Sequence, residues 1–155
     1  MSAQPDFDLR LQPMHVSHLP QVLEIERRAY PFPWSDGVFR DCLKVGYSSW
    51  IVTNLRQEIV AYALMSMAAG EAHVLNLCVD PVMHRRGIGC FVLEYLVSLA
   101  RAAYCTTVFL EVRKSNKAAL RLYEQQGFER IGLRKNYYPD DEGREDAIVL
   151  AFEIV

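Results

Sequence analysis

The sequence has almost no excess of charge and no long apolar run. Its 155 residues include 17 Lys and Arg and 19 Asp and Glu, which gives a net charge of −2 at pH 7. A domain that binds nucleic acid needs a basic face, so this balance argues against a direct nucleic-acid partner. No uninterrupted apolar segment approaches the roughly 18 residues that a membrane span requires, so we expect no membrane partner.

The sequence is also poor in cysteine, and its cysteines follow no pattern. They stand singly in apolar segments, at Cys42, Cys78, Cys90 and Cys105. There is no C-x-x-C pair and no histidine at metal-ligand spacing, so the sequence predicts no metal site. We expect unpaired, buried thiols and therefore a reducing, cytoplasmic location. The first six residues contain neither a basic segment nor an apolar core, so we expect no signal peptide.

What is present is an ordinary globular composition, with 51% hydrophobic and 23% charged residues. Composition and length together predict a single domain over 1–155. The apolar patterns predict strands at 7–12, 48–53, 59–67, 72–79, 106–112, 131–138 and 146–154. They predict helices at 17–29, 35–43, 88–104 and 115–126, with Ser17 and Ser35 as N-caps.

This order, β-α-α-β-β-β-α-β-α-β-β, predicts an α/β domain around one mixed, mostly antiparallel twisted sheet. Strands 72–79 and 106–112 are joined through a helix, so we expect them to be parallel. Residues 139–144 read as a charged hairpin tip. Tyr30–Trp34, with two prolines among three aromatic residues, is a stiff apolar loop. It is either one wall of a substrate groove or a lid on the core.

The junction between strand 72–79 and the next helix is a candidate anion site. Arg85, Arg86, Gly87 and Gly89 stand where the helix begins. Glycines in a first helical turn leave unpaired backbone N–H groups accessible, which suits a pyrophosphate. Close packing or a turn explains Gly-x-Gly equally well. The spacing excludes both the G-x-x-x-x-G-K-[ST] loop and the three-glycine dinucleotide motif.

Two further residues could supply acid–base chemistry. Glu111 is a carboxylate near the end of an otherwise apolar strand. It is either a general base or a carboxylate at the rim of the sheet that pairs with Arg113 or Lys114. Asn116 and Tyr123 share one face of the following helix, with Tyr123 about 10 Å further along. Tyr123 is therefore either an aromatic residue at the core edge or a phenol that faces a ligand held near Asn116.

These segments resemble a known family. Arg85-Arg86-Gly87-Ile88-Gly89 is similar to the [QR]-x-x-G-x-[GA] acyl-coenzyme A loop of the GCN5-related N-acetyltransferase (GNAT) superfamily, with His84 where Gln or Arg is usual. Residues 110–128 closely resemble the L-E-V-R-x-S-N-x-x-A-x-x-L-Y-x-x-x-G-F signature of its RimI branch. Tyr30–Ser35 and Asn136–Pro139, followed by Glu145-Asp146-Ala147, are similar to that branch too. The likeness covers nearly the whole chain.

The resemblance implies a GNAT-type three-layer α/β/α domain that uses acetyl-CoA. It makes Glu111 the general base and Tyr123 the general acid of a direct transfer. RimI members acetylate the N-terminal alanine of small-subunit ribosomal protein S-eighteen, so the N-terminal tail of that protein is the expected partner. The implied cofactor contacts come from strand, loop and helix: Leu77, Cys78, Val79, Arg85, Arg86, Gly87, Ile88, Gly89, Cys90 and Asn116.

Two other functions remain open at this point. One is a GNAT enzyme that acetylates a lysine or a small amine, and the other is a CoA-binding regulatory module without turnover. Deprotonation of a lysine ammonium at pH 7 costs about 3.5 kcal/mol more free energy than deprotonation of an α-ammonium. This difference favours an α-amine as the acceptor. Acidic residues beside the expected substrate loops either attract a basic tail or form a solvated face: Glu24, Glu26, Asp36, Asp140, Asp141 and Glu142.

Overall fold

The computed structural model describes residues 8–154. Residues 1–7, which include Phe7 of the expected first strand and the segment considered for a signal peptide, lie outside the described part. No helix within 8–154 is both long and apolar enough to cross a bilayer. The elements are β1 (Arg10–Pro13), α1 (Leu19–Ala29), α2 (Asp36–Val45), β2 (Ser48–Thr53), β3 (Ile59–Ala68), β4 (Glu71–Val79), α3 (Ile88–Ala102), β5 (Thr107–Arg113), α4 (Lys117–Gln125), β6 (Glu129–Asp140) and β7 (Gly143–Glu153).

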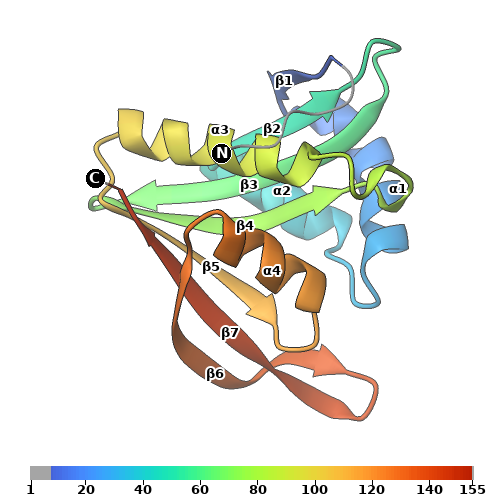
Figure 1. Ribbon diagram of the computed structural model, residues 1–155. Helices are drawn as coiled ribbons and strands as arrows, with labels where there is room; N and C mark the ends of the chain where they lie inside the picture. Colours follow the sequence, from blue (N-terminus) through green and yellow to red (C-terminus); the bar gives the residue numbers. More distant parts are fainter. Residues whose placement is uncertain (1–7, 155) are drawn as a thin grey trace.

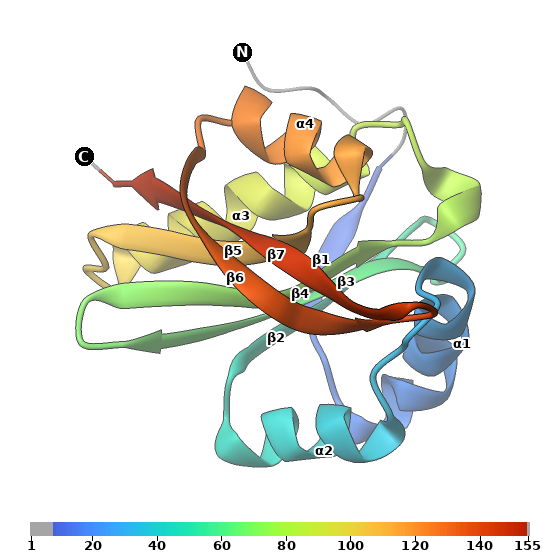
Figure 2. The ribbon, with the colours of Figure 1, turned by 90° about the horizontal axis from the view of Figure 1, so that it is seen from below.

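The strands form one seven-stranded sheet in the order β1-β2-β3-β4-β5-β7-β6. In this sheet β4 and β5 pair in parallel, as expected, and the other neighbouring strands pair antiparallel. Helices α3 and α4 cover one face, and α1 and α2 cover the other (Figure 2). A separate apolar core lies under each helix pair. The predicted element order and the three-layer α/β/α arrangement are therefore both present.

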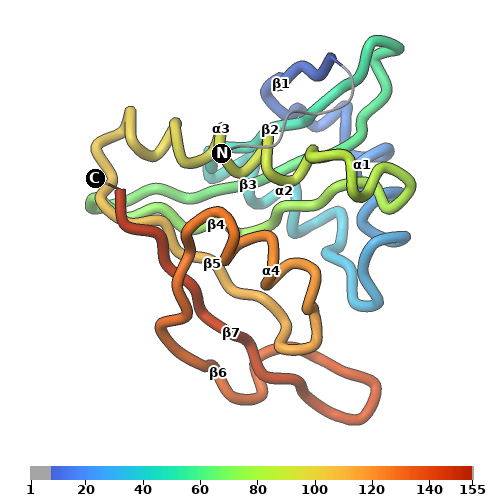
Figure 3. The backbone as a smooth tube through the Cα atoms, viewed as in Figure 1, coloured from blue at the N-terminus to red at the C-terminus, as the bar shows by residue number. Residues whose placement is uncertain are grey.

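The two parallel strands are paired over only part of their length. Their register ends at Val74 and Leu110, although β4 continues to Val79 and β5 to Arg113. Leu75 has no partner on β3, so a bulge interrupts β4 where the pairing with β5 stops. Beyond this point the two strands diverge (Figures 1 and 3). We call this divergence the β4–β5 split.

The helix starts follow local chemistry, with one correction. Ser35 caps α2 as predicted, because its Oγ accepts the N–H of Val38 at 3.3 Å. Ser17 does not cap α1. Residues 16–18 form the short 3-10 helix η1 instead, in which the backbone N–H of His15 donates to Nδ1 of His18 at 2.9 Å.

The hairpin of β6 and β7 is longer than its sequence pattern predicts. The pairing continues to Asp140 and Gly143, so the expected charged tip at 139–144 narrows to the two residues between them. β6 is interrupted at 135–137, where Asn136 has φ +54°.

Gly127 ends α4 as predicted, and it offers a test of the packing there. It has φ +98°, and a Cβ at this position would lie 3.0 Å from Cε1 of Phe152. Gly127→Ala should lower the free energy of unfolding by about 1–2 kcal/mol in urea titrations, because a left-handed backbone strains any side chain. Gly132→Ala is the matched control, since its added Cβ would meet no atom within 4 Å. Equal losses in both variants would contradict this account.

Candidate active site

The alternation of side chains along β5 sets a candidate base apart from its apolar neighbours. Leu110 and Val112 are buried in the core under α3 and α4. Glu111 stands between them and therefore points to the opposite face of the sheet. The buried core on that face draws its strand residues from β2, β3 and β4. Glu111 therefore lies outside this core, beside the β4–β5 split.

Tyr123 comes from the other face of the sheet, on the inner side of α4. It is only 8% exposed, and its ring centroid lies 5.9 Å from that of Phe128. Burial raises the pKa of Tyr123 to about 12, and the nearby Cys78 thiol acts in the same direction. The phenol therefore keeps its proton at neutral pH and can only donate it.

Tyr138 on β6 connects these two groups electrostatically. Burial raises the pKa of Tyr138, the Glu111 carboxylate raises it further, and Tyr123 adds a smaller effect of the same sign. Glu111 and Tyr123 lie on opposite faces of the sheet, and their roles as base and acid stay predictions.

Glu111 has a partner that its own strand does not supply. Its Oε2 atom is shielded from solvent and forms an ion pair with Nε of Arg134 on β6. The hydroxyl of Tyr137 lies 3.5 Å from Oε1 and can donate to it. The alternative pairing with Arg113 is wrong, because Arg113 binds Glu145 at 3.0 Å. Glu111 is thus held by two residues of β6 rather than by its own strand.

The edge of β4 beside the split presents backbone groups. The N–H of Asp80 donates to the carbonyl of Val60 on β3 at 2.8 Å. Backbone groups alternate in direction along a strand, so the N–H and C=O of Leu77 and Val79 point away from β3. These groups face the side where β5 has diverged. Leu77 and Val79, both predicted as ligand contacts, therefore offer a polar strand edge rather than side chains alone.

Two side chains bind the carbonyls of that edge. The hydroxyl of Tyr30 donates to Leu77 O at 3.1 Å, and Nε2 of His84 contacts Val79 O at 3.0 Å. A carbonyl can only accept, so His84 must carry its proton on Nε2 to make this bond. His84 therefore ties the start of the loop back to the end of β4.

The third predicted residue of this edge, Cys78, is 3% exposed. Burial raises the pKa of its thiol to about 11, although the nearby hydroxyls of Tyr62 and Tyr30 oppose that shift. The thiol is therefore protonated at neutral pH, and a thiol is a far weaker nucleophile than a thiolate. The four cysteines are unpaired, and Cys90 is only half-buried while the other three are buried.

Among the four α-helices within residues 8–154, α3 is the one whose start has neither a side-chain cap nor a proline in its first turn. Gly87 occupies the N-cap position with φ +80°, and Arg85 also has a positive φ of +65°. Gly87 has no side chain that could cap the first turn. The N–H groups of Ile88, Gly89 and Cys90 and the partial positive charge of the helix start suit an anion.

Gly89 also has a packing role, as the alternative interpretation required. A Cβ there would lie 3.1 Å from Cδ2 of Leu122 on α4, so a larger residue would require the Leu122 side chain to shift. At the start of α4, Oδ1 of Asn116 accepts the N–H of Ala119 at 3.2 Å. Asn116 is thus the helix cap, and a ligand contact would come from its amide nitrogen.

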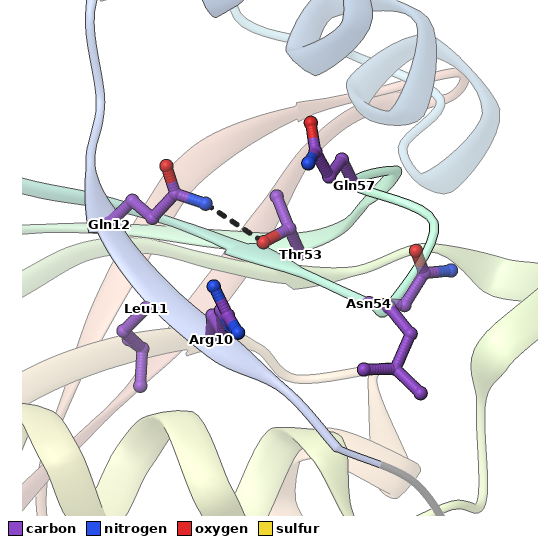
Figure 4. Close-up of a pocket in the computed structure, with 7 residues that line it drawn as sticks. Arg10, Leu11, Gln12, Thr53, Asn54 and Gln57 are labelled. Atoms are coloured by element: carbon purple, nitrogen blue, oxygen red, sulfur yellow. Dashed lines mark hydrogen bonds between the residues drawn. The ribbon is translucent and has the colours of Figure 1, made fainter.

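Two surface hollows lie on the β2–β3 side of the loop. The larger, of about 650 Å³, lies between β1 and the β2–β3 turn, where Gln12 donates to Thr53 at 3.0 Å (Figure 4). The smaller, of about 420 Å³, includes Arg56, Met83 and Arg86 and so adjoins the start of α3. Neither contains Glu111 or Tyr123. Within residues 8–154 no cluster of His, Cys, Asp and Glu could hold a metal ion.

Comparison with known proteins decides the family. Residues 19–128 match the model of the Acetyltransferase (GNAT) family. The chain belongs to the GNAT family of acetyltransferases. The predicted family, fold and acetyltransferase activity are therefore confirmed, whereas the roles of individual residues stay predictions.

This acetyltransferase is 38% identical over 141 residues to the ribosomal protein bS18-alanine N-acetyltransferase of Escherichia coli strain K12, across 91% of this chain and 95% of that protein. The relative of the same name from Haemophilus ducreyi is 36% identical, across 84% and 90%. The crystal structure of the Escherichia coli enzyme has a TM-score of 0.87 at 37% identity, across 95% and 94%. Arabidopsis thaliana NAA60 with acetyl-CoA shares the fold alone, at 17% identity and TM-score 0.85, across 95% and 99%.

Sequence reasoning missed how Glu26 anchors the aromatic loop of this acetyltransferase. Glu26 is 1% exposed. It accepts the backbone N–H of Trp34 at 2.9 Å, the hydroxyl of Tyr62 at 2.6 Å and the amide of Asn76 at 3.1 Å. Glu26 therefore cannot belong to an acidic surface that attracts a basic tail. It holds the Tyr30–Trp34 loop against β3 and β4 instead.

The structure also explains why two motifs of the hairpin occur together. Oδ1 of Asp146 accepts the N–H of Asn136 at 2.9 Å, which fixes the interruption in β6. Arg144 donates to the carbonyls of Asn136 and Tyr137 at 3.1 and 2.9 Å. Tyr137 and Tyr138 are positioned by these contacts. The Glu-Asp-Ala segment thus shapes the Asn-Tyr-Tyr-Pro segment opposite it.

An ion pair fixes the end of β4 where the loop begins. Arg28 binds Asp80 through two contacts of 2.7 and 3.1 Å, and Oδ1 of Asp80 also accepts the N–H of Val82 at 3.2 Å. The hydrogen bond from Arg28 is the main cause that lowers the pKa of Asp80. A lowered carboxyl pKa means that folding favours the ionised form.

Asp80→Asn should therefore destabilise the protein in a pH-dependent way. The loss in unfolding free energy should be fully present at pH 7 and at any pH well above 3.9, the approximate pKa of Asp in the unfolded chain. It should vanish as the pH falls through the lower pKa that Asp80 has in the folded protein. Urea unfolding across this range measures it. Arg28→Gln removes the other half of the pair and should show the same trend, whereas a constant difference at every pH would contradict the assignment.

Proposed function

We propose that this acetyltransferase transfers the acetyl group of acetyl-CoA directly to the α-amine of an N-terminal alanine on a small-subunit ribosomal protein of the bS18 type. The observation that carries the proposal is that a carboxylate and a buried phenol lie on the two elements that follow the β4–β5 split, Glu111 on β5 and Tyr123 on α4. Glu111 lies on the open face beside Arg134, and burial raises the pKa of Tyr123 to about 12, so the phenol keeps its proton. Acyl transfer to an amine requires a base and an acid.

The residues beside the split fit acetyl-CoA. The N–H groups of Leu77 and Val79 can pair with the amides of the pantetheine arm as a neighbouring strand would. The open start of α3, from Arg85 to Cys90, suits the pyrophosphate, and Arg85 and Arg86 add positive charge. Asn116 lies at the start of α4, where its amide can contact the same arm. Acetyl-CoA supplies the activated thioester.

Each proton in the reaction has a residue to move it. Glu111 accepts a proton from the acceptor ammonium, which leaves a neutral amine. The amine nitrogen bonds to the carbonyl carbon of the thioester as the carbon–sulfur bond breaks. Tyr123 donates its proton to the departing sulfur. The nitrogen loses its second proton as the amide forms, and this proton restores the Tyr123 phenol, so that only the proton on Glu111 is released to solvent. A single carboxylate can manage this more easily for an α-amine than for a lysine, whose deprotonation at pH 7 costs about 3.5 kcal/mol more.

Direct transfer is favoured over a covalent route through cysteine. Cys78 is the cysteine on the edge of β4, and burial raises its pKa to about 11. Its protonated thiol would attack a thioester poorly. Four unpaired cysteines also suit a reducing compartment, which supports a cytoplasmic location for an enzyme that modifies a ribosomal protein.

Steady-state release of CoA tests the assignment of base and acid. With a peptide that begins with alanine, Glu111→Gln and Tyr123→Phe should each lower kcat by about 10²–10⁴-fold, because each removes one proton transfer. Binding of acetyl-CoA, measured by calorimetry, should change little in either variant. Turnover equal to wild type in both variants would overturn the assignment.

The same assay identifies the acceptor. A peptide with a blocked N-terminus but an intact lysine should give no turnover above background. Equal rates on blocked and free peptides would mean that a lysine is acetylated. Tight binding of acetyl-CoA without turnover on any amine would point to a regulatory module.

A cysteine variant tests direct transfer. Cys78→Ala should keep kcat within about threefold of wild type, because no covalent step depends on a thiol that stays protonated. Cys105→Ala is the matched control, since Cys105 is also buried, at 5% exposure. Loss of turnover in Cys78→Ala alone, with acetyl-CoA binding intact, would establish a covalent route.

A further inference from the structure

Arg113, the last residue of β5, joins two segments that flank the catalytic face. It stands opposite Ala147 on β7, which in turn stands opposite Arg134 on β6. Arg113 follows Glu111 by two residues, so both side chains lie on the same face of the sheet. Although the hairpin beside it is largely exposed, the Arg113 side chain is only 18% exposed, and that of its partner Glu145 is 16% exposed.

The guanidinium of Arg113 contacts the hairpin through charge, hydrogen bonds and an aromatic ring. Its Nη1 donates to the carbonyl of Pro139 at 2.8 Å and to Oε1 of Glu145 at 3.0 Å. Its Cζ lies 4.7 Å from the ring centroid of Tyr138. The other oxygen of Glu145 accepts the N–H of Ser115 at 2.8 Å, so the carboxylate is held from both sides.

The same guanidinium reaches the aromatic loop after α1. Its Cζ lies 5.3 Å from the ring centroid of Phe32. The ends of this loop are fixed by Tyr30, which binds Leu77 O, and by the N–H of Trp34, which binds Glu26. Phe32 is the middle of the loop, and Arg113 is its contact with the hairpin. The loop and the hairpin approach each other on this side of the molecule (Figure 2).

We propose that Arg113 is a positioning residue for the acceptor. By stacking between Phe32 and Tyr138, it fixes the distance between the aromatic loop and the β6–β7 hairpin. This distance sets the space between the two segments on the face that carries Glu111. This inference rests on the proposed function, in which the acceptor amine reaches Glu111 on this face. Arg113 acts through the two walls and takes no part in the proton transfers.

Arginine suits this position because its guanidinium is planar. A plane can stack on two rings while its edge donates hydrogen bonds to a carbonyl and a carboxylate. A lysine ammonium carries the same charge on a single atom and cannot do both at once. Replacing arginine by lysine therefore keeps the charge near Glu111 and removes the link between the walls.

Kinetics and hydrogen exchange of the full-length protein test the proposal. In Arg113→Lys, the KM for an alanine-initiated peptide should rise about tenfold, the scale of a lost charged hydrogen bond, while kcat and the KM for acetyl-CoA stay within about twofold. Amide exchange in 30–36 and 136–145 should become faster together. Arg130→Lys is the matched control, because Arg130 pairs with Glu124 through two exposed contacts of 3.1 Å elsewhere on the hairpin.

Each outcome decides the question. An unchanged peptide KM in Arg113→Lys, or faster exchange in the hairpin without the loop, would overturn the proposal. If Arg113→Lys fails to fold, Glu145→Gln removes the same anchor and should give the same paired changes. If the wild-type protein does not acetylate the peptide, the proposed function fails, and the paired exchange in 30–36 and 136–145 still decides whether Arg113 links the two segments.

Discussion

The loss of pairing between β4 and β5 is the constraint on which the rest of this structure depends. After the bulge at Leu75, the two parallel strands no longer satisfy each other's backbone groups. Each strand is followed by a helix, β4 by α3 after residues 80–87 and β5 by α4 after residues 114–116. Because ligands of α/β sheets bind beyond the carboxyl ends of parallel strands, the two helix starts and the polar edge of β4 open toward the same place. In the proposed function, Glu111 and Tyr123 act at this place from opposite faces.

The two sides of the split differ in whether backbone groups or side chains are available for contacts. In the proposed function, the cofactor side relies on backbone: the amides of Leu77 and Val79 and the first turn of α3. The acceptor side relies on side-chain pairs, Arg134 with Glu111 and Arg113 with Glu145. Contacts through backbone amides depend little on side-chain identity, whereas a side-chain pair depends on both of its residues.

Periodicity was sufficient to predict the element order and the parallel pair, because each apolar stripe is read locally. Residue spacing alone could not predict the partner of Glu111. Arg134 reaches it only through the register of three strands and the interruption of β6 at 135–137, which depends on Asp146. The cap of α1 was missed because His15 and His18 compete with Ser17, and sequence does not rank such local bonds.

Glu26 was misread for a related reason, because a glutamate on an amphipathic helix normally faces water. Its three donors come from the loop, β3 and β4, and they are brought together only by the fold. One of them is the main-chain amide of Trp34, which every residue except proline possesses. The aromatic loop is thus held by an atom that mutation rarely removes. The side chain of Trp34 can therefore change while this end of the loop stays anchored, whereas Tyr30 and Phe32 are held through their own side chains.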